Sequence, residues 1–201
     1  MKLGISASLK HSTPEEWAKK HKGLGLEVVV FPCSHTQTTA CIDEYVAAAK
    51  EYGLRIAEVG ARKNILDLDE KKRAENFSYC LRQLELADYV GADCCVNIAG
   101  AKGAVWDGGY AENYSQKTYA EIIESVQKLV DTVKPKKTFY TLEPMPWMVP
   151  DTPESYLQLI KDVDRERFAV HMDMVNMLNS PKKYLLTRNI PVRRLTCWVG
   201  T

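Results

Sequence analysis

The sequence predicts an α/β fold on a parallel sheet, a (β/α)8 barrel of the TIM type of which this chain supplies about six βα units. Strand and helix patterns alternate steadily, with six strand starts in the first 173 residues. Such alternation produces a parallel sheet, either doubly wound or closed as a barrel. The dinucleotide fingerprint of a doubly wound sheet is missing, because Gly23 and Gly25 precede a strand instead of following one. Long loops after the fourth and fifth strands favour the barrel, whose sites are built from such loops.

Each element follows from its own pattern. Residues 12–16 (STPEE) combine a cap, a proline and first-turn acids, which begin a helix that Gly23 ends. The near-continuous apolar run at 26–31 is typical of a parallel strand covered on both faces. In chain order we expect strands at about 2–8, 26–31, 54–60, 93–99, 138–144 and 168–173, and helices at about 14–22, 40–52, 69–90, 115–133 and 151–164.

Composition indicates one globular domain without a nucleic-acid or membrane partner. Hydrophobic residues make up 45% and charged residues 26% of the chain, the usual mix for a globular protein. Lys and Arg number 27 against 26 Asp and Glu, so no net charge attracts nucleic acid or an anionic membrane. No apolar run approaches the roughly 18 residues of a spanning helix. The first five residues lead into a strand and not into the long apolar region of a signal peptide.

The cysteines indicate a reducing compartment. The six positions (33, 41, 80, 94, 95 and 197) show no CxxC pairing of the kind that binds metal. Cys94 and Cys95 are neighbours in a strand pattern and therefore face opposite sides, which disfavours a bridge between them. We expect reduced, mostly buried thiols and a cytoplasmic protein.

Two carboxylates end the fifth and sixth predicted strands. Side chains alternate along a strand, so Thr141 and Glu143 share one face, and His171 and Asp173 share the equivalent face one βα unit later. Two acids at the carboxyl ends of neighbouring strands suit an oxygen-ligand metal site at a barrel mouth. On spacing alone, two solvated loop acids are the alternative.

The same two segments resemble a known family. Residues 141–147 (TLEPMPW) and 170–176 (VHMDMVN) resemble the fifth-strand and sixth-strand motifs of the xylose isomerase-like barrels, which include sugar and sugar-phosphate isomerases and epimerases. The resemblance covers residues 1–183. It implies one divalent metal ion, manganese, magnesium or cobalt, held by a Glu after strand five, an Asp after strand six, a His after strand seven and a Glu after strand eight. Glu143 and Asp173 match the first two ligands.

The resemblance also implies a reaction. In such enzymes the metal binds adjacent hydroxyl and carbonyl oxygens of an open-chain sugar, and the ligand glutamates move a proton on and off the carbon beside the carbonyl. A hard cation stabilises the enediolate charge while a nearby carboxylate takes the proton. We therefore expect an isomerase or epimerase of a small sugar or sugar phosphate, acting in carbohydrate metabolism, with Glu143 as a catalytic residue.

The chain departs from the family pattern after residue 183. Residues 184–201 show no helical period and contain no His or Glu to serve as third and fourth ligands. We interpret this tail as a truncated or frame-shifted, disordered end, with a genuine short tail as the alternative. Half of the metal shell is then missing. A six-stranded open sheet would also expose an unpaired edge on each side, which favours self-association into a homo-oligomer.

Two residues near Asp173 are candidate substrate contacts. Asn176 occupies a position where some family members place a substrate-binding His. His171 lies two residues before Asp173 on the same face, about 7 Å deeper along the strand. We interpret His171 as a core histidine or as a histidine supporting a ligand, in preference to a ligand itself.

Further candidates lie on other strands and loops. Glu58 and Asn97 are expected to face the barrel interior near its rim, as substrate contacts or as members of internal hydrogen bonds. Trp147 offers an aromatic wall for a sugar ring or plain packing. His35, after the second strand, is a weaker candidate of the same kind.

Two other functions are alternatives. An abasic-site endonuclease of the same fold would need several metals, a His-rich mouth and a basic DNA face. Four histidines and a net charge of +1 argue against it. The other alternative is an inactive or partner-binding barrel fragment that lacks half of the metal site.

Overall fold

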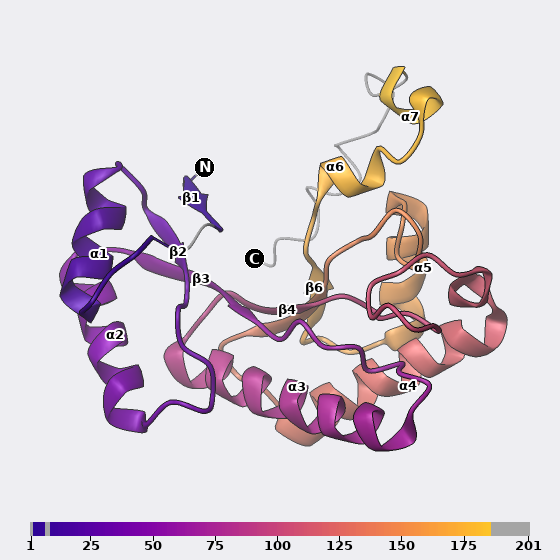
Figure 1. Cartoon of the computed structure of the whole chain (residues 1–201), viewed down its shortest axis with the longest axis horizontal. Helices are drawn as coiled ribbons and strands as arrows, with labels where there is room; N and C mark the ends of the chain where they lie inside the picture. The colour runs from indigo at the N-terminus through magenta and orange to yellow at the C-terminus, as the bar shows by residue number, and fades with distance from the viewer. Residues whose placement is uncertain (1, 7–8, 186–201) are drawn as a thin grey trace.

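The computed structural model describes residues 2–6 and 9–185. Its six strands form one parallel sheet in sequential order, each hydrogen-bonded to the next (Figure 1). This confirms the α/β fold and the barrel-type succession of six βα units. The strands are β1 (Gly4–Ile5), β2 (Val28–Val30), β3 (Arg55–Gly60), β4 (Cys94–Asn97), β5 (Phe139–Leu142) and β6 (Phe168–Val170).

All five predicted helices are present within about two residues of the expected bounds. The helices are α1 (Pro14–Gly23), α2 (Thr39–Glu51), α3 (Glu70–Val90), α4 (Gln116–Val133) and α5 (Pro153–Val163). The cap signals act as expected, since Thr13 accepts a hydrogen bond from the Glu16 backbone N–H at the start of α1. No helix in the described part of the chain is long and apolar enough to cross a membrane.

Three short helical elements were not predicted. They are the 3-10 helix η1 (Ala111–Tyr114), α6 (Met174–Met177) and α7 (Pro181–Leu185). The predicted tail over 184–201 therefore overlaps the end of α7, and from residue 186 on that prediction lies outside the described residues. Short helices carry too few turns for a hydrophobic period to be read from sequence.

Most of the predicted strands were too long, and β6 shows a physical reason. Residues 168–173 were expected to be one strand, but pairing with β5 ends at Val170. Beyond it, the His171 N–H donates to the hydroxyl of Tyr156 on α5 at 3.1 Å and not to a neighbouring strand. A buried side chain thus ends the ladder, and the local sequence carries no sign of it.

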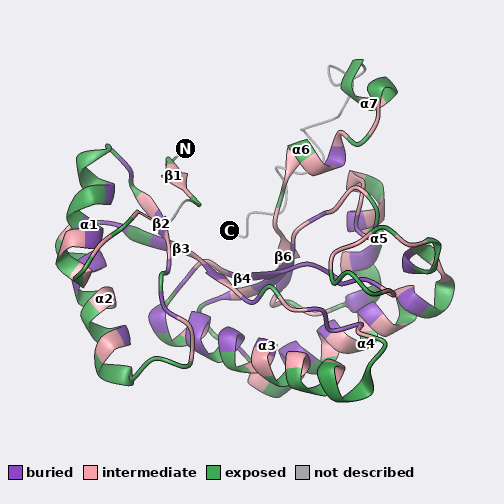
Figure 2. Cartoon of the chain, in the orientation of Figure 1, coloured by how far each residue is buried: buried purple, intermediate pink, exposed green. Residues whose placement is uncertain are grey.

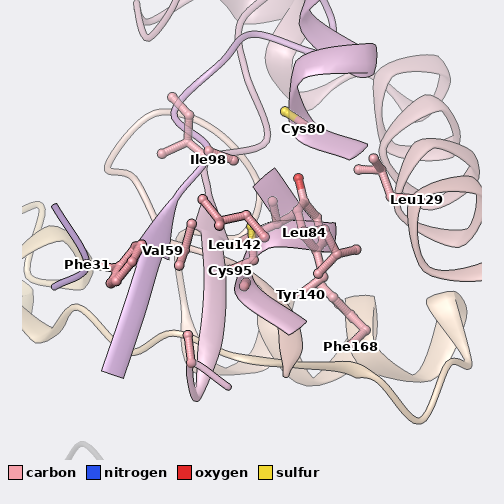
Figure 3. Packing of buried hydrophobic residues seen from close by; sticks show 14 of the residues in the cluster. Phe31, Val59, Cys80, Leu84, Cys95, Ile98, Leu129, Tyr140, Leu142 and Phe168 are labelled. Carbon is pink, nitrogen blue, oxygen red and sulfur yellow. The ribbon is translucent and has the colours of Figure 1, made fainter. Parts of the chain in front are cut away.

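The hydrophobic core lies between the sheet and its outer helices. Buried residues gather on the inner sides of the helices, while their outer sides are exposed (Figure 2). Figure 3 shows side chains from neighbouring strands packed with side chains from α3 and α4 in one cluster. The most buried members include Val59, Cys95 and Tyr140 from the strands and Leu84 and Leu129 from the helices, all fully buried. This packing fixes which face of each strand is turned toward the helices and which toward the barrel axis.

The described cysteines are free, as expected for reduced thiols. Cys95 faces the core, and its neighbour Cys94 donates to the Ala57 carbonyl at 3.5 Å. Burial raises the pKa of both Cys80 and Cys94 to about 12. These two thiols are therefore protonated at neutral pH and poorly nucleophilic.

Gly100, at the start of the loop after β4, is required by both its backbone and its surroundings. Its φ is +99°, and a Cβ at this position would overlap Asn64 Oδ1. We expect Gly100→Ala to lower the free energy of unfolding by about 3 kcal/mol or more, from backbone strain and overpacking together. Urea denaturation measures the change. Gly53→Ala is the matched control, because Gly53 has φ +62° but open space around it. This variant should be destabilised only by backbone strain, by about 1–2 kcal/mol. Equal losses in the two variants would contradict the predicted overlap.

Candidate metal and substrate site at the strand ends

Glu143 lies at the carboxyl end of β5. Its backbone N–H donates to the Asn97 carbonyl at 2.7 Å, so the β4–β5 ladder continues one residue past the strand. Leu142 is fully buried in the core. Since side chains alternate, the Glu143 side chain points to the opposite, inner face, where it is half-buried.

Asp173 lies three residues beyond β6, at the start of α6. Its Oδ1 accepts hydrogen bonds from the backbone N–H groups of Val175 at 2.8 Å and Asn176 at 3.2 Å. One carboxylate oxygen is therefore engaged in capping α6, and this holds the side chain in place. The other oxygen has no hydrogen-bond partner among the described residues.

The charges around Glu143 show which side chains surround it. Burial raises the pKa of the Glu143 carboxyl, and the negative charges of Asp173 and Glu58 raise it further, while His171 and Arg62 act in the opposite direction. The carboxylate makes no hydrogen bond within the described part of the chain. Two acids that repel each other, with oxygens that lack donors, would be stabilised by a cation placed between them.

Glu58, near the end of β3, joins His171 to Arg62. His171 Nε2 lies 3.4 Å from Glu58 Oε2, and Arg62 donates to Glu58 Oε1 at 3.2 Å. Burial alone would raise the pKa of Glu58, but the hydrogen bond and charge of His171 and those of Arg62 outweigh it and leave that pKa below its ordinary value. The contact spans the sheet from β3 to β6 and brings Glu58 and His171 into the same site as Glu143.

Arg62 is a site residue that the sequence reasoning missed. It follows β3 by two residues and adopts a left-handed backbone with φ 40°, which is uncommon for a residue other than glycine. Its side chain is mostly exposed and uses one nitrogen for Glu58. The only sequence signal is a basic residue directly behind the polar face of a predicted strand.

Asn97 does not face the barrel interior, and this prediction was wrong. Its amide exchanges two hydrogen bonds with the Lys63 backbone, at 2.9 and 3.0 Å, and donates to the Tyr140 hydroxyl at 3.2 Å. It also contacts Cys80 on α3. Only 1% of the residue is exposed. Strand alternation divides residues into two sets but does not tell which set faces inward, and here Asn97 and Cys95 belong to the helix side.

His35 is held by α3 and is not brought to Glu143 by any described contact. Its backbone N–H and Nδ1 both approach Gln83 Oε1, at 2.8 and 2.9 Å. Its ring packs edge-on against Tyr79 with 4.8 Å between centroids. Gln83 in turn donates to the Gly60 carbonyl at the end of β3. His35 thus ties the loop after β2 to α3.

Trp147 joins the loops that follow β4 and β5. Its Nε1 donates to the Asp107 carbonyl at 2.5 Å, and its own carbonyl accepts from the Asn113 amide at 3.0 Å. The residue is 41% exposed. The indole therefore fastens the loop beyond Glu143 to the loop after β4, and part of its surface remains open to solvent.

Asn176 lies in α6 beside the loop after β5. Its amide approaches Met145 Sδ at 3.6 Å, and the residue is half-buried. Met145 and Met148 form an isolated bridge that folds this loop back on itself. Asn176 thus contacts Asp173 through its backbone N–H and the loop after β5 through its side chain. Trp147 lies in that loop, and neither side chain donates a hydrogen bond to the carboxylate of Glu143 or Asp173 within the described residues.

The described residues fit a divalent cation in part. Glu143 and Asp173 supply two hard oxygen donors of the kind that magnesium and manganese take. No group of three or more His, Cys, Asp or Glu side chains that could hold a metal occurs among residues 2–6 and 9–185. The His171 Nδ1 is buried and lacks a hydrogen-bond partner in the same residues. The described residues therefore offer two candidate ligands, Glu143 and Asp173, and not a complete shell.

Comparison with known proteins places this arrangement in a family. A sequence model described as "Xylose isomerase-like TIM barrel" matches residues 14–193. No curated protein matches the chain by sequence.

Solved structures with the same fold include two sugar epimerases. The 3-keto-D-glucoside 4-epimerase of E. coli superposes with a TM-score of 0.71 at 19% identity, over 97% of this chain and 76% of that one. The D-psicose 3-epimerase of Clostridium cellulolyticum H10, solved with D-tagatose, gives 0.74 at 16% identity, over 100% and 71%.

A third similar structure contains a metal. A xylose isomerase-like TIM barrel protein from Mycobacterium smegmatis in complex with magnesium gives a TM-score of 0.63 at 19% identity, over 89% of this chain and 64% of that one. The chain thus spans about two thirds to three quarters of the length of these three proteins. The sequence match and the sheet order agree, and the chain belongs to the xylose isomerase-like TIM barrel family.

Proposed function

We propose that this chain provides the metal-binding and proton-transfer half of a divalent-metal-dependent isomerase or epimerase of a small sugar or sugar phosphate. Family membership and the epimerases among the similar structures support a sugar-directed enzyme. The observation that carries the proposal is Glu143, a half-buried carboxylate without a hydrogen-bond donor, beside the charge of Asp173 at the same end of the sheet. The other ligands come from water or from donors outside the described residues.

Glu143 takes the proton from the sugar carbon beside the carbonyl. Burial raises its pKa, which brings its basicity closer to that of a base that works near neutral pH. Manganese, magnesium or cobalt, when bound, supplies positive charge for the oxygens of the reacting carbons. Asp173 would help Glu143 to hold this cation, and its position is fixed by the hydrogen bonds that its Oδ1 accepts from α6. Loss of this proton leaves the substrate as an enediolate. The carbon is inverted when a second acid, from outside the described residues, returns a proton to its opposite face.

Glu58, His171 and Arg62 hold the opposite side of the site. The Glu58 carboxylate keeps the His171 ring oriented, and Arg62 keeps part of its guanidinium free toward solvent. Asn176 and Trp147 are the proposed substrate contacts on the loop side, through an amide for hydroxyl groups and an indole for an apolar sugar face.

Solvent-deuterium exchange tests the proposed reaction. The protein is incubated in D2O with Mn²⁺ and D-fructose, D-psicose or D-tagatose, with a phosphorylated ketose in parallel, and followed by proton NMR. We expect one substrate to gain deuterium at the carbon beside the carbonyl while its epimer or isomer forms. Treatment with EDTA should stop both signals, and added Mn²⁺ should restore them.

The competing outcomes separate the alternatives. A product that forms without uptake of deuterium, or with EDTA present, would contradict metal-assisted proton transfer through solvent-exchanging carboxylates. A folded protein that turns over none of the substrates with Mn²⁺ would favour an inactive or partner-binding chain.

A further inference from the structure

The buried hydroxyl of Tyr156 lies between the two strand ends that carry the proposed metal ligands. Tyr156 belongs to α5, the helix that connects β5 to β6, and it is fully buried. Its ring packs against Phe168 of β6, with 6.5 Å between the ring centroids. The hydroxyl therefore approaches β5 and β6 from the helix side, near their carboxyl ends.

Four backbone groups surround this hydroxyl. It accepts hydrogen bonds from the Leu142 N–H at 3.2 Å and the His171 N–H at 3.1 Å. Its own proton points to the Leu142 carbonyl at 2.5 Å, with the Ala169 carbonyl at 3.2 Å as the other acceptor. One donor and two lone pairs are all in use, so the hydroxyl is fully satisfied.

These contacts lie where the β5–β6 ladder ends. The register pairs Leu142 with Val170, and no strand pairing continues beyond it. Glu143 stays paired with β4 through its N–H, but no strand pairing joins it to His171. The Tyr156 hydroxyl instead binds Leu142, the residue before Glu143, and His171, two residues before Asp173. It takes the place of the next rung of the ladder.

We propose that Tyr156 is a positioning residue that sets the separation of Glu143 and Asp173 through its hydroxyl; the proposal rests on the function proposed above. A phenylalanine would pack equally well against Phe168, so packing alone does not require the oxygen. Without it, the buried Leu142 N–H and the partly buried His171 N–H lose this acceptor, and the strand ends move to find other partners. Since hydrogen bonds that orient ligands tune metal affinity, the movement reaches the metal site.

Tyr156→Phe tests the proposal, with Tyr119→Phe as the matched control. The Tyr119→Phe variant also loses one hydroxyl hydrogen bond, the one that Tyr119 on α4 donates to Asp162 at 2.7 Å. Neither of these two residues belongs to the proposed site. Four quantities are measured for each variant: the Mn²⁺ affinity of the metal-free protein by calorimetry, kcat and KM for the substrate found by deuterium exchange, and the free energy of unfolding by urea.

We expect Tyr156→Phe to weaken Mn²⁺ binding about 10-fold or more. We expect kcat of Tyr156→Phe to fall by a similar factor, with KM changing less. Tyr119→Phe should match the wild type in Mn²⁺ affinity, kcat and KM. If Tyr156→Phe does not fold, 3-fluorotyrosine at position 156 keeps the ring and alters the hydroxyl, and should shift Mn²⁺ affinity in the same direction.

Several results would overturn the proposal. A Tyr156→Phe protein that loses stability but binds Mn²⁺ as the wild type does would show a purely structural hydroxyl. If Tyr156→Phe does not fold, an unchanged Mn²⁺ affinity in the 3-fluorotyrosine protein would contradict the proposal. If the wild type and Tyr156→Phe bind Mn²⁺ and turn over substrate equally well, this inference is contradicted and the proposed function is not. A wild type that does neither contradicts the proposed function and this inference with it.

Discussion

Glu143→Gln is expected to lower kcat by about 10³-fold or more while the protein remains folded. Glutamine keeps the size of the side chain and an oxygen that can face a cation, but it cannot take a proton. Burial raises the pKa of the Glu143 carboxyl because it disfavours the charged form. A neutral amide at this half-buried position should therefore not destabilise the fold. Steady-state kinetics with the substrate found by deuterium exchange measures the loss.

Glu154→Gln is the matched control for this substitution. Glu154 lies in the first turn of α5 and is exposed. It should keep wild-type kcat within about twofold, because surface substitutions away from special features have small effects. If Glu143→Gln retained a tenth or more of the wild-type kcat, Glu143 would not be the base.

Asn113→Ala is expected to lower the free energy of unfolding by about 2–4 kcal/mol, because it removes the buried amide that binds three partly buried backbone groups. Asn113 is 1% exposed and lies in η1. Its oxygen accepts from the Lys102 N–H at 2.8 Å, and its amide donates to the carbonyls of Gly108 and Trp147, both at 3.0 Å. One side chain thus joins the loop after β4 to the loop that follows Glu143. Urea denaturation measures the loss of stability, and indole fluorescence should report a more solvated Trp147.

Asn179→Ala provides the comparison for Asn113→Ala. Asn179 also donates to a carbonyl of the loop after β5, that of Pro146 at 3.0 Å, but it is exposed. Water replaces the lost donor there, so the expected change is below about 1 kcal/mol. A loss in Asn113→Ala no larger than in Asn179→Ala would mean that the buried amide does not hold the two loops together.

The order of elements and the position of Glu143 at the end of β5 could be predicted from the sequence because both depend on local patterns. Asp173 was expected to end the sixth strand but lies three residues beyond it, as the cap of α6. The cap at Thr13 and the left-handed glycine at Gly91 each mark a helix end through residues that are close together in sequence. Glu143 follows a strand whose alternation is regular, so its side of the sheet follows from Leu142. Periodicity and turn chemistry are sufficient for such features.

The inward face of β4 and the extent of β6 could not be predicted in the same way. The alternation in 93–99 is equally consistent with Asn97 facing either side, and its partners Lys63 and Cys80 are distant in sequence. The ladder of β6 ends early because of Tyr156, a residue of the preceding helix. Both outcomes depend on tertiary contacts that local propensity does not contain.

The contact between Glu58 and His171 was also beyond sequence reasoning. The two residues are separated by 113 positions and meet only because the sheet curves from β3 to β6. Arg62 joins them through a left-handed backbone that no glycine or asparagine signals. Contacts between residues on distant strands can be identified only from the three-dimensional structure.

Titration of Mn²⁺ into the metal-free 201-residue protein by calorimetry tests the central claim most directly. The claim is that Glu143 and Asp173 form the protein's part of a cation site at the strand ends. It predicts one Mn²⁺ bound per chain with a micromolar dissociation constant, lost in Glu143→Ala and in Asp173→Ala. Absence of binding, or binding that survives both substitutions, would contradict it.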